Sequence, residues 1–285
     1  MIIPAFGVTL ADFDLLRGKG CVLVDTTCGS VLVVWKRVEQ YARDGYTAVI
    51  HGKYEHEETR ATSSRTGRWP EGRYIVVRDP EETERAARYI ESGGDRDAFL
   101  ASFGEACGPG FDPDADLVRI GLANQTTMLS SESLAIAERL KQAMIRRYGE
   151  AALGEHFRAF DTICTATQDR QDAVGALLAS GVDLMLVLGG YNSSNTTHLV
   201  EIASRRTPTY HIDSASCLVS AEEIVHKPFA SAETATARGW LPKGRAVIGI
   251  TAGASTPNSE IGETLARLFT FRGIDPDALL AEDAE

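Results

Sequence analysis

Asp25-Thr26-Thr27-Cys28 and Asp161-Thr162-Ile163-Cys164 are two copies of one motif, and they organise the rest of the chain. Each copy follows an apolar run and precedes a helical pattern and a second apolar run that ends in glycine. Gly45 follows the first cysteine by 17 positions, and Gly181 follows the second by 17. The repeat predicts two strand–helix–strand units, each with a cysteine at the carboxyl end of its first strand. Because open parallel sheets bind ligands at that edge, the two thiols are expected to meet there.

The composition is that of a globular protein with two or three compact domains. The chain has 285 residues, 44% of them hydrophobic and 24% charged. It contains no run of 18 apolar residues and no signal-peptide pattern, so a cytoplasmic protein without a membrane partner is expected. The net charge of −11 disfavours nucleic acid as a partner, because nucleic-acid binding requires a basic surface. A small anionic ligand is still compatible, since backbone N–H groups and hydroxyls can hold it.

Alternating strand and helix patterns predict an α/β fold. Repeated strand–helix units are expected to form two full domains and a remnant of a third around a central site. The expected divisions are a remnant at 1–28, a second domain at 29–163 with a surface insertion at about 91–116, and a third domain at 164–285. The clearest predicted elements are helices at 30–43, 80–90 and 131–147 and strands at 46–50, 74–77 and 117–123.

Five predicted strand ends carry small, polar or ligand-type residues, which implies a common polar face. These ends are 25–28, 51–58, 124–127, 161–164 with 189–196, and 251–256. The segments Tyr191–Thr196 and Thr251–Thr256 combine hydroxyls with neighbouring glycines, and the second precedes a helix. Both suit a phosphate group without needing a basic residue.

The cysteines and histidines divide into two classes. An odd number of cysteines, five, with no export signal favours free thiols or metal ligands over disulfides. Cys28 and Cys164 are the expected ligands, whereas the other three are expected to be buried as small hydrophobic residues: Cys21, Cys107 and Cys217. Isolated histidines are expected to be satisfied core or surface groups, namely His51, His198, His211 and His226. His56 with Glu58 differs, because an imidazolium can hold phosphate and a carboxyl group can relay a proton.

Several segments, spread over almost the whole chain, resemble one family. They include Pro4-Ala5-Phe6-Gly7, Val24–Cys28, Ile50–Tyr54 with His56–Thr59, Ala123–Leu129, Asp161–Cys164, Asn192–Thr196 and Gly253–Pro257. In this order they resemble the 4-hydroxy-3-methylbut-2-enyl diphosphate reductases, the LytB family, and particularly its plant and cyanobacterial branch. These are the terminal iron–sulfur enzymes of the non-mevalonate isoprenoid pathway.

The resemblance implies a reductase that removes the substrate hydroxyl and releases isopentenyl and dimethylallyl diphosphates. It implies a [4Fe–4S] cluster with Cys28 and Cys164 as two ligands, proton delivery by Glu58, and orientation of the hydroxyl by Thr126. The residues implied to bind the allylic diphosphate are His56, Ser193, Ser194, Asn195 and Ser255, with Thr167 near the second cysteine. The implied electron donor is a ferredoxin- or flavodoxin-type protein.

One family feature is absent from this sequence. Family members begin with a Phe-Cys-x-Gly-Val type segment that carries the first cluster cysteine, and the chain as written has none. The third cysteine ligand of the cluster is therefore expected to be missing from this chain. Two alternatives follow: a cluster-free diphosphate-binding relative or inactive truncated form, and a zinc-dependent hydrolase that uses His56, Glu58 and the cysteines.

Overall fold

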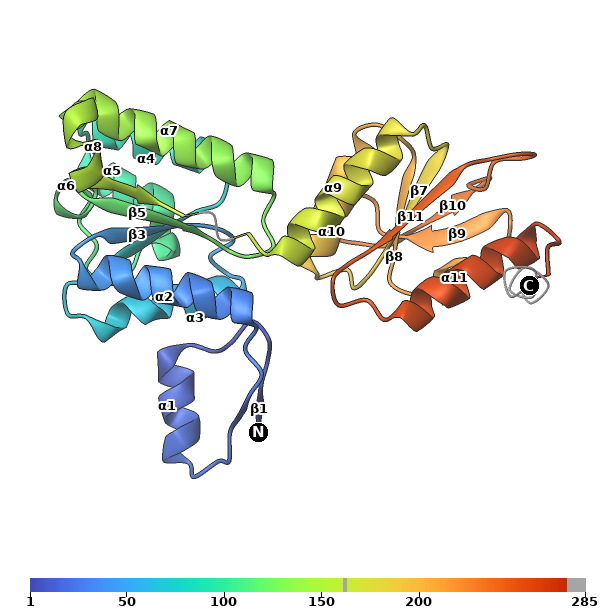
Figure 1. The fold of residues 1–285 in the computed structure, drawn as a ribbon, viewed down its shortest axis with the longest axis horizontal. Coiled ribbons are helices and arrows are strands. Elements are labelled where there is room, and N and C mark those ends of the chain that lie inside the picture. Colours follow the sequence, from blue (N-terminus) through green and yellow to red (C-terminus); the bar gives the residue numbers. More distant parts are fainter. Residues whose placement is uncertain (161–162, 276–285) are drawn as a thin grey trace. The chain divides into compact units, whose positions relative to one another are not determined.

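The computed structural model describes residues 1–160 and 163–275 and divides into two compact units, Met1–Cys164 and Thr165–Glu285 (Figure 1). Asp161 and Thr162, the first half of the second motif copy, lie outside the described residues. The α/β class predicted from the sequence is confirmed, since parallel sheets alternate with helices in both units. The division predicted at residue 28 stays a prediction.

The main sheet of the first unit has four parallel strands in the order β4-β3-β5-β6. These are β4 (Tyr74–Val77), β3 (Thr47–His51), β5 (Ile120–Asn124) and β6 (Phe157–Ala159). Every residue of β3 and β5 is buried, as expected for central strands covered on both faces. Figure 1 shows the covering helices on opposite sides: α2 (Gly29–Arg43) and α3 (Glu57–Ser64) on one, α4 (Pro80–Ser92) and α7 (Ser130–Tyr148) on the other.

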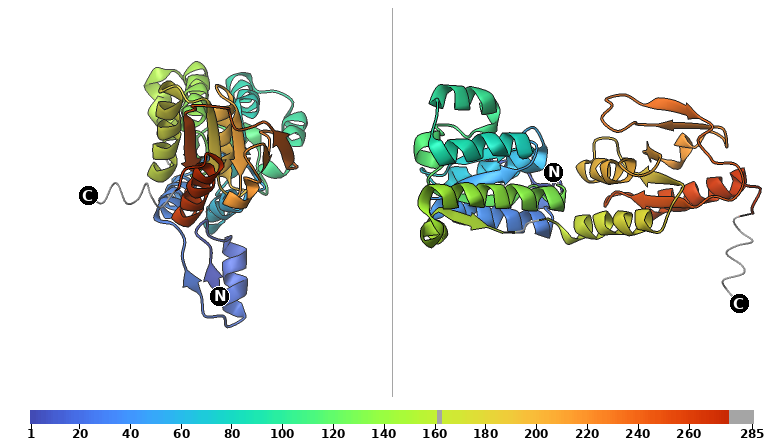
Figure 2. Two further views of the ribbon diagram at one scale, coloured as in Figure 1. Left: turned by 90° about the vertical axis from the view of Figure 1, so that its right-hand side faces the viewer. Right: turned by 90° about the horizontal axis from the view of Figure 1, so that it is seen from above.

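The amino-terminal residues form a lobe of their own on this unit. Strands β1 (Ile2–Ile3) and β2 (Val24–Asp25) pair in parallel and are joined by α1 (Leu10–Gly18). No residue of α1 is buried, and Ile2 and Val22 are 71% and 80% exposed. Figure 2 shows this lobe projecting from the rest of the unit.

The segment at 91–116 combines exposed turns with core contacts. Residues 92–98 are exposed, in agreement with a surface insertion. Three phenylalanines from the same segment are nevertheless buried in the main core: Phe99, Phe103 and Phe111. Phe99 and Phe103 belong to α5 (Arg96–Phe103), and Phe111 to the loop after it. They are buried because the apolar side of this short helix packs against the core of the first unit. The segment therefore contributes to the core of the first unit.

The second unit is built on three parallel strands in the order β11-β7-β8. They are β11 (Ile248–Ala252), β7 (Leu184–Leu188) and β8 (Thr209–Ile212), with helices α9 (Thr165–Ala179), α10 (Ser194–Ser204) and α11 (Asn258–Phe271). Alternate residues of β7 face opposite layers: Met185 and Val187 pack with α9 and α10, whereas Leu184, Leu186 and Leu188 pack in a cluster that includes Leu268 of α11. Both faces of this central strand are thus covered.

Shorter elements connect these layers. An antiparallel hairpin of β9 (Glu223–His226) and β10 (Ala235–Arg238), which the sequence did not predict, follows the three-stranded sheet (Figure 2). The residue after β9, Lys227, bridges to His211 of β8 and donates its N–H to the His211 carbonyl at 2.9 Å. The remaining helical pieces are η1 (Arg65–Arg68), η2 (Gly104–Ala106), α6 (Pro113–Asp116), η3 (Glu150–Ala152), α8 (Leu153–His156) and η4 (Ala215–Cys217). Among the described residues, no helix is long and apolar enough to cross a membrane.

Both predicted strand–helix–strand units are observed, but in each of them the two strands belong to different sheets. In the first copy β2 pairs with β1, whereas β3 pairs with β4 and β5. In the second copy β6 belongs to the four-stranded sheet and β7 to the three-stranded one. The repeated motif therefore marks the two places where the chain leaves one sheet and enters the next.

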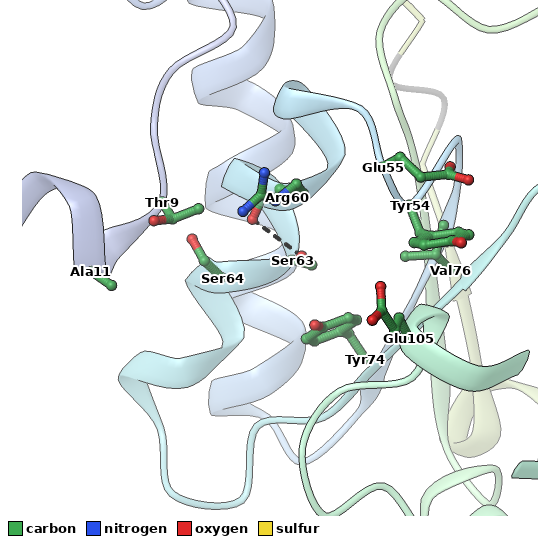
Figure 3. Close-up of a pocket in the computed structure, with 10 residues that line it drawn as sticks. All are labelled: Thr9, Ala11, Tyr54, Glu55, Arg60, Ser63, Ser64, Tyr74, Val76 and Glu105. Atoms are coloured by element: carbon green, nitrogen blue, oxygen red, sulfur yellow. Dashed lines mark hydrogen bonds between the residues drawn. The ribbon is translucent and has the colours of Figure 1, made fainter.

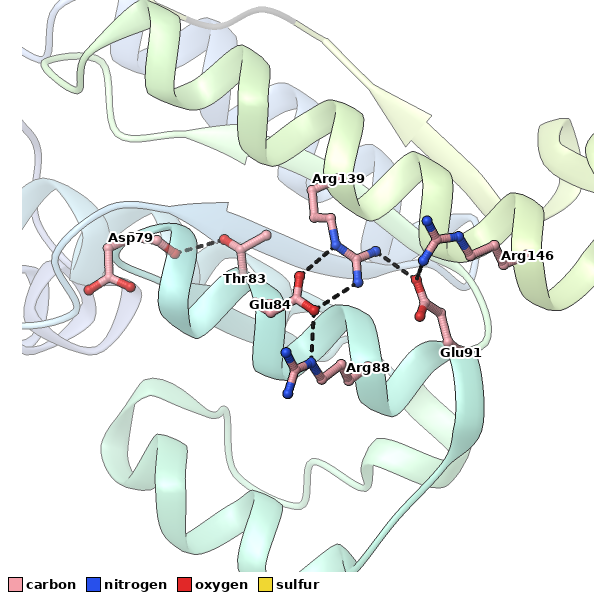
Figure 4. A network of polar contacts seen from close by, with 7 residues as sticks. All are labelled: Asp79, Thr83, Glu84, Arg88, Glu91, Arg139 and Arg146. Atoms are coloured by element: carbon pink, nitrogen blue, oxygen red, sulfur yellow. Dashed lines mark hydrogen bonds and ion pairs between the residues drawn. The ribbon is translucent and has the colours of Figure 1, made fainter.

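An ion-pair network fixes the two helices on one face of the main sheet (Figure 4). Arg139 of α7 donates from Nε to Glu84 of α4 at 2.6 Å and from Nη1 to Glu91 at 2.7 Å. Arg88 donates to Glu84 at 2.8 Å. Hydrogen bonds from Arg139 and then Arg88 lower the pKa of Glu84 to about 2.

Replacing the central arginine is expected to cost a small, pH-dependent amount of stability. Because Glu84 is 38% exposed, solvent screening limits the loss in Arg139→Gln to about 1 kcal/mol of unfolding free energy at pH 7. The lowered pKa means that the contribution is complete above the ordinary glutamate range, near pH 4.5, and decreases as the pH falls toward 2. Urea unfolding at pH 7, 5 and 3 measures this difference.

Arg88→Gln is the control, because the Arg88 side chain is 76% exposed and contacts only Glu84 in the network. Its effect is expected to stay within a few tenths of a kcal/mol. An Arg139→Gln loss that is unchanged at pH 3 would contradict the assignment to Glu84.

Candidate functional site

Strand pairing brings the predicted polar ends of β3 and β5 together at one edge of the main sheet. His51 and Asn124 are paired in register, and the Gln125 N–H donates to the His51 carbonyl at 2.8 Å. The His51 Nδ1 atom lies 2.7 Å from the Ser133 hydroxyl of α7, so this histidine is a buried structural group, as predicted. The edge itself is rigidly defined by these contacts.

Gln125 fixes the loop that leads from β3 to the predicted acid. Its side-chain oxygen accepts from the Lys53 N–H at 3.1 Å and from the Thr59 hydroxyl at 3.0 Å. A Cβ atom on Gly52 would lie 2.9 Å from Thr59 Oγ1 and 3.0 Å from Gln125 Cβ, so only glycine fits there. The sequence placed Gln125 in the polar strand end at 124–127 but indicated no role for it.

Glu58 and Thr126, predicted from separate motifs, are in direct contact. The Thr126 N–H donates to Glu58 Oε1 at 2.6 Å, and the Thr126 hydroxyl also hydrogen-bonds this carboxyl group. Glu58 is only 3% exposed. Burial raises the pKa of Glu58, against the opposing effect of the two bonds from Thr126. A carboxyl group in this environment can retain its proton closer to neutral pH and deliver it to a bound ligand.

His56 holds the amino terminus of the helix that carries Glu58. Its Nδ1 atom accepts from the Glu58 N–H at 3.2 Å, so in the neutral ring the proton is on Nε2. Burial, together with the nearby Lys53 charge, lowers the pKa of His56, while Glu57 acts in the opposite direction. The Phe6 ring lies edge-on to His56, with 6.4 Å between ring centroids.

Both predicted cysteine ligands form backbone hydrogen bonds within the first unit. The half-buried Cys164 donates from its N–H to the Thr126 carbonyl at 3.2 Å. The exposed Cys28 stands at the amino terminus of α2 and donates to the carbonyl of Ala5, next to Phe6. A meeting of the two thiols across one pocket stays a prediction. Within residues 1–160 and 163–275, no group of three His, Cys, Asp or Glu side chains is placed to hold a metal.

In the second unit, the two predicted anion loops follow neighbouring strands at one sheet edge. Leu188 of β7 is paired with Ala252 of β11, and the Leu188 carbonyl accepts from the Gly253 N–H at 2.8 Å and the Thr256 hydroxyl at 3.2 Å. Gly189 has φ +144°, and a Cβ there would lie 2.6 Å from Thr196 Oγ1. Glycine is required at this position so that the two loops can approach α10 closely.

The amino terminus of α10 collects buried polar atoms. Ser193 is the N-cap and accepts from the Thr196 N–H at 3.3 Å. Ser194, Asn195 and Thr196 are 6%, 3% and 1% exposed. Among the described residues, the hydroxyls of Ser194 and Thr196 and both side-chain amide atoms of Asn195 have no hydrogen-bond partner. Unsatisfied buried polar groups each cost about 1–3 kcal/mol, and their concentration at a helix amino terminus points to an anionic ligand.

The other residues predicted for substrate binding are more scattered. Ser255 is exposed in the loop after β11, and Thr167 is buried in α9 with 2% exposure. Arg170 of α9, which the sequence analysis assigned no role, donates from Nε to the Ala252 carbonyl at 3.1 Å and so places a guanidinium group beside that strand end.

A cavity of about 560 Å³ in the first unit lies outside this arrangement (Figure 3). Arg60, Ser63 and Ser64 of α3 line one side, and Tyr54, Tyr74 and Glu105 line the other. None of the predicted site residues contributes to its wall. The cavity is therefore not part of the candidate site.

Comparisons with known proteins agree with the motifs. A family model described as LytB protein matches residues 1–269. A 4-hydroxy-3-methylbut-2-enyl diphosphate reductase of Gloeobacter violaceus is 51% identical over 275 residues, which are 96% of this chain and 65% of the relative. The corresponding protein of Thermosynechococcus vestitus is 50% identical over 96% of this chain and 67% of its own length. The chain thus spans about two thirds of the length of these curated relatives.

Solved structures show the same fold. A structure of (E)-4-hydroxy-3-methyl-but-2-enyl diphosphate reductase, the terminal enzyme of the non-mevalonate pathway, has a TM-score of 0.51 and 27% identity, and covers 94% of this chain and 74% of its own. A Plasmodium falciparum E-1-hydroxy-2-methyl-but-2-enyl-4-diphosphate reductase has a TM-score of 0.64 at 19% identity and covers 94% and 66% of the two chains. At that identity the second likeness concerns the fold alone.

The buried Glu58 carboxyl group is expected to make stability depend on pH. A glutamate whose folded-state pKa is raised favours the folded state most below its unfolded pKa, near 4.3, and this contribution is lost as the pH rises through the folded value. Glu58→Gln removes this pH dependence of the unfolding free energy while keeping a side-chain oxygen that can accept from the Thr126 N–H. Relative to the unaltered protein, the variant should gain unfolding free energy between pH 5 and pH 8.

Urea unfolding at the two pH values measures this gain. Glu57→Gln, on the exposed side of the same helical turn, is the control and should shift both values equally. A constant difference between Glu58→Gln and the unaltered protein would show that Glu58 is ionised throughout this range.

Proposed function

Because the chain belongs to the LytB protein family, we propose that it acts in reductive removal of the hydroxyl group of 4-hydroxy-3-methylbut-2-enyl diphosphate, as the names of its relatives suggest. The products would be isopentenyl and dimethylallyl diphosphates, the outcome of the terminal step of the non-mevalonate isoprenoid pathway. Two separate observations support the proposal: the first unit buries an acid, Glu58, and the second buries polar atoms without partners among the described residues at the amino terminus of α10.

The diphosphate end of the substrate is assigned to hydroxyl, amide and backbone groups. Ser194 and Asn195 offer buried polar atoms that lack partners among the described residues, and the first N–H groups of α10 add their dipoles. Ser193, Ser255, Thr167 and His56 complete the proposed set. A neutral set of this kind is compatible with the net charge of −11, because helix termini bind anions without basic side chains.

The hydroxyl end is assigned to Glu58 and Thr126. Reduction replaces the C–O bond by a C–H bond and releases the oxygen as water, which consumes two electrons and two protons. Glu58 would supply a proton to the departing oxygen and be reprotonated from solvent, with its carboxyl group held in place by the Thr126 N–H at 2.6 Å. Thr126 would orient the substrate hydroxyl. The electrons would come from a ferredoxin- or flavodoxin-type protein.

The [4Fe–4S] cluster implied by the family is matched only in part by the described residues. Cys28 and Cys164 are suitable thiolate ligands, but such a cluster takes three or four, and the described residues place no third His, Cys, Asp or Glu beside them. When bound, the cluster would supply the electron transfer. The same finding gives no support to a zinc-dependent hydrolase built on His56, Glu58 and the cysteines.

The buried polar atoms without partners at the α10 amino terminus are equally compatible with a second candidate, a cluster-free diphosphate-binding relative. Such a protein would use the α10 terminus and the loop at 253–256 but would not reduce its ligand. Iron content and turnover separate it from the reductase.

Binding of inorganic pyrophosphate tests the anion site apart from catalysis. Asn195→Ala removes both buried amide atoms and should weaken pyrophosphate binding about tenfold or more, since hydrogen bonds to charged groups contribute about 1.5–3 kcal/mol. Isothermal titration calorimetry measures the dissociation constant. Ser204→Ala, at the other end of α10, is the control and should bind as the unaltered protein does. Equal affinities for both variants would remove α10 from the site.

Anaerobic turnover tests the reductase itself. With methyl viologen reduced by dithionite as electron source, mass spectrometry should detect loss of the allylic substrate and formation of both product diphosphates. Glu58→Gln should lower the rate by about 10²–10⁴-fold with little change in substrate affinity, because general acid catalysis contributes that much. Glu57→Gln should retain the rate.

Undiminished turnover in Glu58→Gln would contradict its role as the acid. Tight substrate binding by a protein that contains no iron and shows no turnover would contradict the reductase proposal and support the diphosphate-binding candidate.

A further inference from the structure

His198 differs from the satisfied core histidine that the sequence predicted. It lies in α10, is 6% exposed, and its Nε2 atom has no hydrogen-bond partner among the described residues. One ring nitrogen of His198 does have a polar partner, as in His51 with Ser133 and His211 with the Gly189 carbonyl, so Nε2 alone is in question. A buried imidazole nitrogen without a partner carries a desolvation cost of about 1–3 kcal/mol.

The position of His198 on the helix relates it to the anion site. It follows Ser194 by four residues and Asn195 by three, and residues at these spacings share a helix face. Helical side chains also lean toward the amino terminus, which here carries the Ser194 hydroxyl and the Asn195 amide. Three residues on one face therefore present buried polar atoms that lack partners in the described structure.

The other ring nitrogen is already held. His198 Nδ1 lies 3.3 Å from Glu201 Oε2, and the second oxygen of Glu201 accepts from Arg205 Nη2 at 2.7 Å. The hydrogen bond from His198, followed by the effect of Arg205, lowers the pKa of Glu201. Glu201 is therefore an anion that accepts from Nδ1–H, which orients the ring and leaves Nε2 as the nitrogen available to a ligand.

We propose that His198 is a further residue of the anion site at α10, with Nε2–H as a donor to the diphosphate beside Ser194 and Asn195. With Nδ1–H given to Glu201, a donor at Nε2 means that the ring is protonated on both nitrogens when the anion is bound. His198, Glu201 and Arg205 then carry one net positive charge along a helix whose first turn has none. This inference rests on the proposed function, because it deepens the assignment of the same site.

Nuclear magnetic resonance with ¹⁵N-labelled histidine tests the contact directly. The probe is inorganic pyrophosphate added to the full chain, with the His198 signals assigned by comparison with His198→Gln. Binding should shift the Nε2 resonance of His198 to a protonated, hydrogen-bonded position. A histidine with a merely structural role would keep its resonance unchanged while pyrophosphate binds.

Two variants provide the matched affinity measurement by calorimetry. His198→Leu fills the space without a polar atom and should weaken pyrophosphate binding about tenfold, whereas His198→Gln keeps an N–H donor near the Nε2 position and should remain within about threefold of the unaltered protein. Circular dichroism checks that both fold. Unchanged binding in His198→Leu, or an unmoved Nε2 resonance, would overturn this inference alone. Absence of pyrophosphate binding by the unaltered protein would overturn the proposed function and this inference together.

Discussion

The peptide groups around Thr126 hold the candidate catalytic region together. The Thr126 N–H donates to the buried Glu58 carboxyl group at 2.6 Å, and its carbonyl accepts from the Cys164 N–H at 3.2 Å. Glu58 and Cys164, each more than thirty positions from Thr126 in the sequence, are thereby both hydrogen-bonded to the end of β5. Because β5 is fully buried and paired on both sides, this strand end is a rigid support for an acid whose position decides its chemistry.

Much of the fold could be predicted from local patterns. The strand at 74–77 has the predicted bounds, and the helix predicted at 30–43 is observed at Gly29–Arg43. The change of sheet within each repeated unit could not be predicted, because local periodicity does not show which strands pair. The β9–β10 hairpin was missed for a similar reason, since its strands at 223–226 and 235–238 show little apolar alternation and β10 is largely exposed.

The candidate site was predictable where a motif named a residue type and unpredictable where a role depends on packing. Glu58, Thr126 and Asn195 were selected from motifs, and the structure buries all three. The role of Gln125 depends on two long-range acceptor contacts and on a glycine without room for a Cβ atom. The proposed role of His198 depends on its Nε2 atom, which is buried without a partner among the described residues, and no sequence pattern predicts such an atom.

Each unit buries polar groups that cost folding free energy: a hydrogen-bonded carboxyl group in the first and hydroxyl and amide groups without partners among the described residues in the second. Glu58 in one unit and the α10 terminus in the other are maintained at a cost in folding free energy, as expected for groups whose partner is a ligand. The central claim is that Glu58 keeps its proton to a higher pH than an exposed glutamate does. Infrared difference spectroscopy of the carboxylic C=O stretch, compared between the unaltered protein and Glu58→Gln, measures this most directly. The account predicts a protonated-carboxyl band that is absent from the variant and persists above the pH range in which exposed glutamates ionise; ionisation of Glu58 within that ordinary range would contradict it.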